Sequence, residues 1–429
     1  MHVAIVGNGV TGVSAALRLR ARRPDWRITL VSGESTYHWS RPALMYVFMG
    51  HMRYADTKPF PDSFWGEQRL ELVRGWVTRL DLGSRRLELA GQPPLHWDKL
   101  LLATGARSNR FDWPGQELAG VQGLYGLSDL RALHETCARA RAAVVVGGGL
   151  IGVELSEMLR SRGLAVTVLV REDSYWRNAL PAEESELVNR AIRAHGVELR
   201  LATELARVLD DGAGRCAGVE TTRGERIACE LVGLTAGVRP NVALVAGTPV
   251  RVGRGVLVDR LFRTSVPDVF AAGDCAELER PDGTTLVQQL WYTGKLQGEH
   301  VADVMAGDER AYEPGPAYNS AKFFDLEFQT YGDVPATAGR GDSLYWQDEG
   351  GQRALRIAHA GGRVTGFNAL GLRWRQAVAE RWIAERRELA HVLAHLADAH
   401  FDPELHGRHE REMAAAFARQ GAGARTGAA

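Results

Sequence analysis

Two glycine-rich turns in this sequence have the residue types and spacing that hold a nucleotide. They are Gly7-Asn8-Gly9-Val10-Thr11-Gly12 and Gly147-Gly148-Gly149-Leu150-Ile151-Gly152, and each lies between an apolar run and a stretch of helical character. In such a turn the first glycine permits the bend, the second lets backbone approach a pyrophosphate, and the third lets helix and strand pack closely. The helix N-terminus then offers free N–H groups to the phosphates. The pattern predicts two dinucleotide sites, with contacts from Gly7, Gly9, Gly12, Gly147, Gly149, Ile151 and Gly152.

Two acidic residues are placed to complete the first of these sites. Asp274 lies in the segment VFAAGDCAEL, where a buried strand and a short turn precede the acid. We expect Asp274 to bring the chain back to the first nucleotide and to hold its ribityl or pyrophosphate portion. Glu34 follows the strand expected at residues 27–31, where a carboxylate can accept hydrogen bonds from both ribose hydroxyls of an adenosine. Two dinucleotide sites, followed later in the chain by Asp274 at the end of a strand, suggest a flavin that exchanges electrons with a nicotinamide.

The second site leaves the choice of nicotinamide open. The strand expected at residues 165–170 ends in Val170-Arg171-Glu172. Arg171 could pair with a 2′-phosphate, or Glu172 could take the ribose hydroxyls, so both NADPH and NADH fit.

The elements that must position these turns are apolar runs at residues 2–6 and 142–146. Both are continuous rather than alternating, as in strands buried on both faces of a parallel sheet. Residues 13–22 have helical character, with small and branched apolar side chains that can pack on such a sheet.

Composition excludes several classes of protein. Lys+Arg and Asp+Glu both number 52, so no basic surface for nucleic acid is expected. The 13 histidines show no ligand spacing, and we expect no metal site. Four scattered cysteines predict no disulfide scaffold and fit a reducing cytoplasm. No apolar run is long enough to span a bilayer, no signal peptide begins the chain, and residues 421–429 are expected to be a disordered tail.

Residues 34–44 carry a resemblance to a known family. Glu34-Ser35-Thr36-Tyr37-His38-Trp39-Ser40-Arg41-Pro42-Ala43-Leu44 is similar to the E-P-H-L-P-Y-x-R-P-P-L stretch of the ferredoxin and rubredoxin reductase group. That group lies within the FAD-dependent pyridine nucleotide-disulfide oxidoreductase superfamily. The resemblance implies that Arg41 and Pro42 lie along the FAD. The family continues with S-K, whereas this chain has Met45-Tyr46, so the family lysine near the flavin ring is missing.

Further segments match the same family in order. Glu154 matches the Glu of its G-x-E motif, which reaches toward the nicotinamide or flavin and is the one catalytic residue that the resemblance implies. Other cofactor contacts implied by the resemblance are Val77, Ala103, Thr104, Gly105, Gly237, Gln289 and Leu290. The helix expected after Leu290 should present its positive N-terminus to the flavin.

The resemblance implies an α/β protein with two Rossmann-like domains, the second inserted in the first. We expect an FAD domain at 1–110 and 242–310, an NAD(P) domain at 111–241, and a C-terminal α+β domain with a helical extension at 311–420. Apolar stripes on the helical extension suit core or homodimer packing, with docking of an electron partner as the sharper alternative.

The implied activity is that of an FAD-dependent NAD(P)H oxidoreductase, in which hydride passes to flavin N5 and electrons pass on to a second acceptor. The acceptor is a small redox protein such as a ferredoxin or rubredoxin, or a small molecule. No cysteine precedes Cys137, which argues against the dithiol relay of the disulfide reductases. Two alternatives stay open: a quinone reductase at a membrane surface, and a flavoprotein whose C-terminal third has a binding or signalling role.

Overall fold

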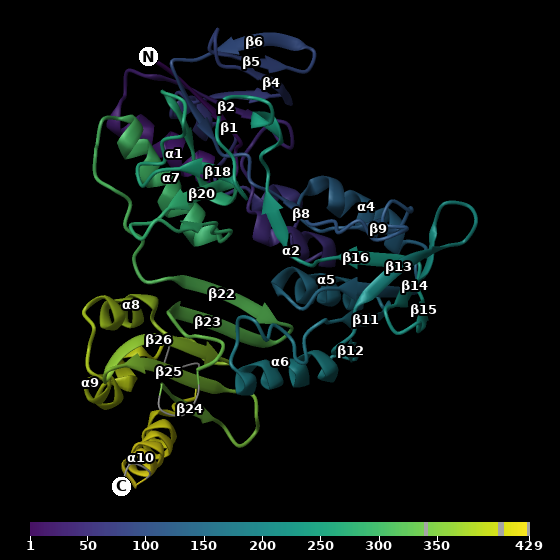
Figure 1. Ribbon diagram of the computed structural model, residues 1–429, viewed down its shortest axis with the longest axis vertical. Coiled ribbons are helices and arrows are strands. Elements are labelled where there is room, and N and C mark those ends of the chain that lie inside the picture. The colour runs from purple at the N-terminus through teal and green to yellow at the C-terminus, as the bar shows by residue number, and fades with distance from the viewer. Residues whose placement is uncertain (339–341, 402–406, 427–429) are drawn as a thin grey trace. The chain divides into compact units, whose positions relative to one another are not determined.

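The protein was analysed as a computed structural model that describes residues 1–338, 342–401 and 407–426. The chain divides into two compact units (Figure 1). The first contains residues 1–110, 123–135 and 237–313, and the second contains residues 111–122, 136–236 and 314–429. Residues 123–135 thus pack with the first unit, whereas the sequence placed them in the NAD(P) domain. The second unit contains both the expected NAD(P) region and the expected C-terminal domain.

The first unit is built on a parallel five-stranded sheet with the order β19-β7-β1-β2-β3. Its strands are β1 (His2–Val6), β2 (Arg27–Ser32), β3 (Glu71–Arg74), β7 (Lys99–Leu102) and β19 (Val269–Ala271). The central β1 pairs with β2 from His2 to Val6 and with β7 from Val3 to Val6. Every residue from Val3 to Val6 is buried, as the continuous apolar run predicted.

Two helices cover this sheet. They are α1 (Val10–Arg22) and α7 (Trp291–Met305), which pack side by side (Figure 1). Gly298 lies so close to α1 that a Cβ there would be 2.3 Å from the Thr11 carbonyl oxygen. The helix that follows the first glycine turn is therefore held directly against the helix that follows Asp274.

Smaller elements complete the first unit. Its two smaller three-stranded sheets are β4 (Val77–Asp81), β5 (Arg86–Leu89) and β6 (Gln92–His96), and β18 (Val256–Val258), β20 (Ala276–Glu279) and β21 (Thr285–Leu286). The strands β8 (Ala106–Ser108) and β17 (Val238–Pro240) form a pair. The helices are α2 (Leu44–Met49), α3 (Phe64–Glu67) and all but the last two residues of α4 (Leu127–Cys137).

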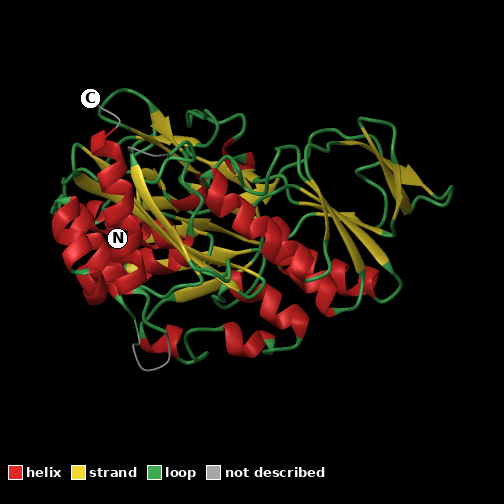
Figure 2. Cartoon of the chain, turned by 90° about the horizontal axis from the view of Figure 1, so that it is seen from below, coloured by secondary structure: helices red, strands yellow, loops and turns green. Residues whose placement is uncertain are grey.

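The second unit repeats the strand, glycine turn and helix pattern. Helices are red and strands are yellow in Figure 2. The parallel sheet of the second unit has the order β12-β11-β10-β16-β9. The elements are β9 (Val121–Gln122), β10 (Ala142–Val146), α5 (Leu150–Ser161), β11 (Ala165–Leu169), α6 (Ala182–Ala194), β12 (Glu198–Arg200), the antiparallel β13 (Leu205–Asp210), β14 (Cys216–Thr221) and β15 (Arg226–Ala228), and β16 (Leu231–Leu234).

The C-terminal part of this unit is an antiparallel sheet, in the order β22-β23-β26-β25-β24, with helices after it. It contains β22 (Tyr318–Phe323), β23 (Leu326–Gly332), β24 (Ser343–Gln347), β25 (Ala354–Ala360), β26 (Arg363–Leu370), α8 (Gln376–Ala384), α9 (Leu389–Ala394) and α10 (Glu410–Thr426). The helix α10 continues to Thr426, whereas the sequence led us to expect a disordered tail over residues 421–429, and 427–429 lie outside the described residues.

A buried ion pair joins the C-terminal sheet to α6. The Arg356 guanidinium, only 1 % exposed, donates to Glu184 at 2.6 and 2.9 Å, and Glu184 is fully buried. Glu183 and the Ser343 hydroxyl accept the remaining bonds of Arg356. The pair connects the C-terminal sheet with the region around α6. Removing either partner would leave the other charge buried and unpaired, which is strongly destabilising.

No helix in the described part of the chain has both the length and the apolar character needed to cross a membrane.

Candidate functional site

The first glycine turn has the geometry of a nucleotide cradle. Gly7 has φ +116°, and a Cβ there would lie 2.1 Å from the Ala103 carbonyl oxygen. A Cβ on Gly12 would lie 2.0 Å from the Gly7 carbonyl oxygen, so both positions exclude a side chain. Gly9 differs, because nothing lies within 4 Å of where its Cβ would be. The open space at Gly9, at the N-terminus of α1, suits a pyrophosphate.

The second turn has the same three features. Gly147 has φ +125°, and its Cβ would lie 2.7 Å from the Thr235 carbonyl oxygen. A Cβ on Gly152 would lie 2.4 Å from the Gly147 carbonyl oxygen, and Gly149 again faces open space. Ile151 lies in the first turn of α5, beside this opening. The two glycine turns therefore share one geometry, in which the first and third glycines are crowded and the middle glycine faces open space.

Asp274 lies in a short 3₁₀ helix (Gly273–Cys275) directly after β19. The Tyr125 hydroxyl donates to Asp274 Oδ2 at 3.2 Å and accepts the Ala106 N–H at 2.8 Å. Burial raises the pKa of Asp274, and the Tyr125 hydrogen bond and the Arg41 charge offset part of that effect. Burial, and then the Asp274 charge, raise the pKa of Tyr125, so this phenol stays protonated and able to donate.

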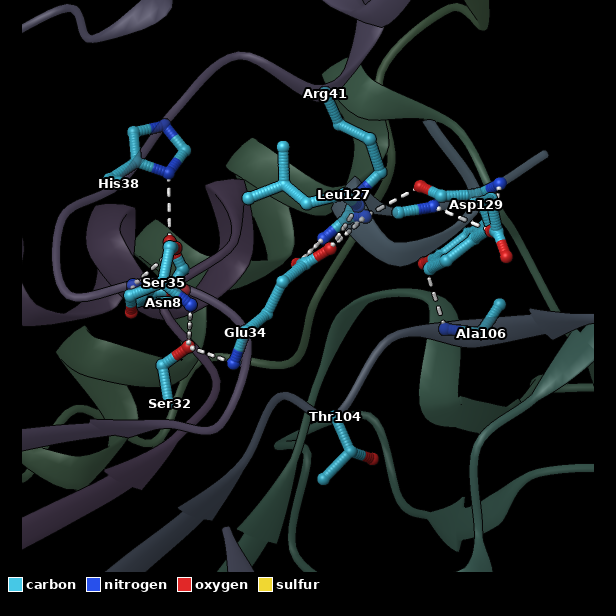
Figure 3. Close-up of polar contacts among 12 residues, drawn as sticks. Asn8, Ser32, Glu34, Ser35, His38, Arg41, Thr104, Ala106, Leu127 and Asp129 are labelled. Carbon is cyan, nitrogen blue, oxygen red and sulfur yellow. Dashed lines mark hydrogen bonds and ion pairs between the residues drawn. The ribbon is translucent and has the colours of Figure 1, made fainter. Parts of the chain in front are cut away.

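Arg41 and Glu34 form an ion pair (Figure 3). The Arg41 guanidinium donates to Glu34 Oε2 at 2.6 Å and to the Tyr125 carbonyl at 2.6 Å. Glu34 Oε1 also accepts the Leu127 N–H at 2.9 Å. Burial lowers the pKa of Arg41, but the charge and hydrogen bond of Glu34, together with the nearby Tyr125 and Asp274, outweigh burial and raise the pKa. Both Glu34 oxygens thus have protein partners, and its contact with a ribose stays a prediction.

A second network orders the loop after β2 (Figure 3). The Asn8 side-chain amide donates to the Ser35 carbonyl at 2.9 Å, and His38 Nδ1 lies 2.8 Å from the Asn8 carbonyl oxygen. Burial lowers the pKa of His38, so its ring is neutral and Nδ1 donates to that carbonyl. This loop is therefore tied to the first glycine turn itself.

The remaining predicted contacts of the first unit lie at the same end of the sheet. The Thr104 hydroxyl donates to the Asn241 carbonyl at 2.7 Å, and a Cβ on Gly105 would lie 2.9 Å from the Tyr125 hydroxyl. Ala103 directly follows β7, Val77 begins β4, and Pro42 lies in a 3₁₀ helix (Arg41–Ala43). Leu290 is the N-cap of α7, and the side-chain amide of Gln289 lies 3.5 Å from the Asp274 carbonyl oxygen.

These residues fit FAD. The open cradle at Gly9 suits its pyrophosphate. Gln288 Oε1 is buried with no hydrogen-bond partner among the described residues, as expected for an acceptor that faces a ligand. FAD supplies the hydride and electron chemistry when it is bound, while the protein supplies orientation and electrostatics.

Glu154 lies in α5, two residues after Gly152. Burial, and then the charge of Glu157, raise the pKa of Glu154 to about 7, while the Lys322 charge acts in the opposite direction. Lys322 comes from β22 and forms a 2.5 Å ion pair with Glu157. The family lysine is missing at Tyr46, but the structure thus brings another lysine to the helix that carries Glu154.

The residues after β11 are also paired. Arg171 donates to Glu172 at 2.8 Å, and 71 % of its side chain is exposed. Val170 is fully buried and would clash with a Cβ on Gly148, at 2.8 Å. The first carboxylate after the end of β11 at Leu169 is therefore that of Glu172, three residues further on. Gly237, predicted to lie beside the cofactor, is grouped with the first unit, where its carbonyl accepts the Asn109 N–H at 3.0 Å.

Sequence reasoning missed Tyr125, His38 and Lys322. Tyr125 lies two residues before α4, and nothing in its local pattern links it to Asp274. His38 is part of the resembling stretch but matches a proline there. Each of these side chains acquires its role from a partner that is distant in the sequence.

Comparisons with known proteins agree with this geometry. Residues 1–298 match the family model described as pyridine nucleotide-disulphide oxidoreductase. The chain is 33 % identical over 290 residues to a rhodocoxin reductase of Rhodococcus erythropolis, covering 67 % of this chain and 68 % of that protein. It is 32 % identical over 309 residues to the biphenyl dioxygenase system ferredoxin–NAD(+) reductase component of Paraburkholderia xenovorans, covering 71 % and 74 %.

A solved structure shows the same fold. The ferredoxin reductase for the CYP199A2 system of Rhodopseudomonas palustris superposes with a TM-score of 0.79 at 26 % identity, covering 86 % of this chain and 91 % of that one. The expectation of two Rossmann-like domains and a C-terminal α+β region is confirmed. The chain belongs to the pyridine nucleotide-disulphide oxidoreductase family, and it is an FAD-dependent NAD(P)H oxidoreductase.

Proposed function

We propose that this enzyme takes hydride from NADH and passes electrons to a small iron–sulfur protein of the ferredoxin type. The observation that carries the proposal is the absence of a dithiol from the flavin-binding unit. Cys275 is the single cysteine within residues 1–110, 123–135 and 237–313, and a dithiol relay needs two. Electrons must therefore leave the flavin for an acceptor outside this chain.

The identity of that acceptor is supported by the relatives. The two curated relatives described above are named as reductases of rhodocoxin and of a dioxygenase-system ferredoxin. We infer that this chain serves a partner of the same chemical class, rather than a quinone.

NADH is supported as the donor on two grounds. One relative is named a ferredoxin–NAD(+) reductase. In this chain the cation that would meet a 2′-phosphate, Arg171, is already neutralised by Glu172 at 2.8 Å. A 2′-phosphate would have to displace that carboxylate, whereas the ribose hydroxyls of NADH can donate to it.

We assign the cofactor contacts accordingly. In the first unit, the Gly9 cradle takes the pyrophosphate of FAD and Asp274 takes the ribityl portion. In the second, the Gly149 cradle takes the pyrophosphate of NADH. All four cysteines are free thiols, which supports action in the reducing cytoplasm.

The test is an anaerobic titration of the purified protein with NADH and, separately, NADPH, followed by the visible flavin absorbance. Bleaching at lower concentrations of NADH is the expected result. Reduction of a [2Fe–2S] ferredoxin, a rubredoxin and a soluble quinone is then compared under the same conditions. Faster reduction of the quinone than of either protein would contradict the proposed partner, and bleaching by NADPH alone would contradict the proposed donor.

A further inference from the structure

Trp76 is a large aromatic side chain that the fold holds in solvent. Its side chain is 66 % exposed, the highest value among the exposed large hydrophobic residues of the described chain. It follows β3 and directly precedes β4. An exposed indole is unfavourable in water, so its position calls for an explanation.

The backbone around Trp76 is well anchored. The Gly75 N–H donates to the Ser32 carbonyl at the end of β2, at 2.9 Å, and the Trp76 carbonyl accepts the Ala90 N–H at 2.9 Å. The Arg74 carbonyl accepts from the Gln92 side chain at 2.7 Å. The exposed indole is thus carried on an ordered segment and not on a free loop.

One face of the indole lies on Gly33. A Cβ added to Gly33 would lie 2.1 Å from Cδ2, 2.3 Å from Cε3 and 2.5 Å from Cε2 of Trp76, so any side chain at position 33 would displace the ring. Gly33 is the residue that follows β2 and precedes Glu34. The indole therefore lies flat over the carboxyl end of β2 and leaves most of its other face exposed.

The order of the strands in the first sheet indicates which half of FAD would lie near Trp76. The first glycine turn follows the central strand β1, and Asp274 and Thr104 follow β19 and β7 on one side of it. A dinucleotide whose pyrophosphate lies at Gly9 extends to both sides of β1. If its flavin half lies toward Asp274, its adenosine half lies toward the ends of β2 and β3, which are on the other side.

A second aromatic residue flanks the same end of β2. Tyr54 is 37 % exposed, and its hydroxyl lies within hydrogen-bonding reach of the Ser35 side chain. Gly33 and Ser35 enclose Glu34, so exposed aromatic surface lies on both neighbours of the predicted ribose-binding acid. Aromatic rings beside a groove are the usual platform for a purine base.

We propose that Trp76 binds the adenine ring of FAD by stacking on the free face of its indole. Gly33 allows the indole to lie flat, and Gly75 ties it to the end of β2. The inference rests on FAD as the cofactor, and it assigns a binding residue that the sequence did not indicate, next to the predicted cofactor contact Val77.

The experiment compares FAD and FMN, which differ by the adenosine half. Purified holoprotein is diluted, FAD release is followed by flavin fluorescence, and FMN affinity is measured by competition with FAD. We expect Trp76→Ala to weaken FAD binding by about 5- to 100-fold and to leave FMN binding unchanged. Trp76→Phe keeps an aromatic face and should lose less than about 3-fold. The control Phe111→Ala removes an aromatic side chain that is 54 % exposed in the second unit, and should change neither.

A second readout uses the ligand without its flavin. After the FAD has been removed, ADP should quench the part of the tryptophan emission that wild type has and Trp76→Phe lacks. Unchanged FAD affinity in Trp76→Ala, or equal losses of FAD and FMN, would overturn the inference. A wild-type protein without FAD would instead overturn the cofactor assignment, and failure to reduce a ferredoxin would overturn only the proposed function.

Discussion

The Tyr125 hydroxyl donates a hydrogen bond to Oδ2 of Asp274 across 3.2 Å, and so joins residues 149 positions apart in the chain. The same Tyr125 is held by Arg41, whose guanidinium lies 4.6 Å from the Tyr125 ring centre. Asp274, Tyr125 and Arg41 therefore form a connected polar group at the carboxyl end of the first sheet. We propose that this group helps to hold FAD, because Asp274 and Arg41 are both predicted FAD contacts and Tyr125 joins them.

Asp274→Ala should weaken FAD binding by about 10-fold or more, since it removes both a ligand group and the partner of a buried phenol. NADH affinity should change little, because the second cradle lies in the other unit. The flavin-to-protein ratio after gel filtration and the FAD dissociation constant measure the effect. Tyr125→Phe is the matched variant, with a smaller loss expected. A protein with Asp274→Ala that keeps its full FAD content would refute the assignment of Asp274.

Gly9→Val and Gly149→Val form a matched pair. Neither residue has a positive φ, and neither has an atom within 4 Å of its Cβ position, so the valine strains nothing in the protein itself. Each valine instead fills its cradle. Gly9→Val should abolish FAD retention, while Gly149→Val should keep FAD but raise the NADH concentration needed for bleaching by about 10-fold or more.

Gly66→Val controls for the general cost of valine at an open glycine, since Gly66 also has nothing within 4 Å. It lies in the short helix α3, away from both glycine turns in the sequence. This variant should purify fully yellow and react normally. A yellow Gly9→Val protein would show that the first turn does not hold FAD.

Glu154→Gln should change how stability depends on pH. The pKa of Glu154 is 4.5 in an ordinary environment and about 7 in the folded protein. Between these values the unfolded chain loses this proton first, so the wild type loses stability as pH rises. Gln cannot ionise. The stability of the variant relative to wild type should therefore increase by on the order of 1–3 kcal/mol across this window. Urea unfolding at several pH values measures it, and parallel curves would contradict the raised pKa.

Glu172→Gln should shift the donor preference toward NADPH. The substitution frees Arg171 for a 2′-phosphate and weakens the acceptor for ribose hydroxyls. We expect the ratio of kcat/KM for NADPH to that for NADH to rise by about 10-fold. Arg171→Gln is the opposite variant and should leave NADH use nearly unchanged. A fall in NADPH use in Glu172→Gln would rule out this arrangement.

Replacing all four cysteines by alanine should leave NADH-dependent ferredoxin reduction largely intact. Cys275 is fully buried, where its thiol lies 3.3 Å from the Leu102 carbonyl oxygen, and burial raises its pKa. Cys216 and Cys229 lie 3.9 Å apart, buried in the β13–β15 region of the other unit. The cost should appear as lower stability. A near-complete loss of activity in a folded, flavin-loaded variant would restore a thiol mechanism.

The strand, glycine turn and helix at each nucleotide site could be predicted from short-range sequence patterns. A strand, a glycine turn and a helix require only neighbouring residues, because the glycines are needed by local backbone geometry and the apolar runs by local burial. The sequence therefore predicted β1, α1, β10 and α5, and also the placement of Asp274 after a strand. The absence of any cysteine before Cys137 likewise argued against a dithiol relay from the sequence alone.

Only the tertiary structure decided which side chains meet. The pairing of Tyr125 with Asp274, of Lys322 with Glu157, and of Trp76 with Gly33 joins segments that are distant in the sequence and brought together by sheet order. Helix or strand periodicity reports which face of an element is buried, but not which residue lies opposite. For the same reason the sequence predicted that residues 123–135 belong to the NAD(P) domain, whereas the contacts of Arg41 and Glu34 with this segment group it with the first unit.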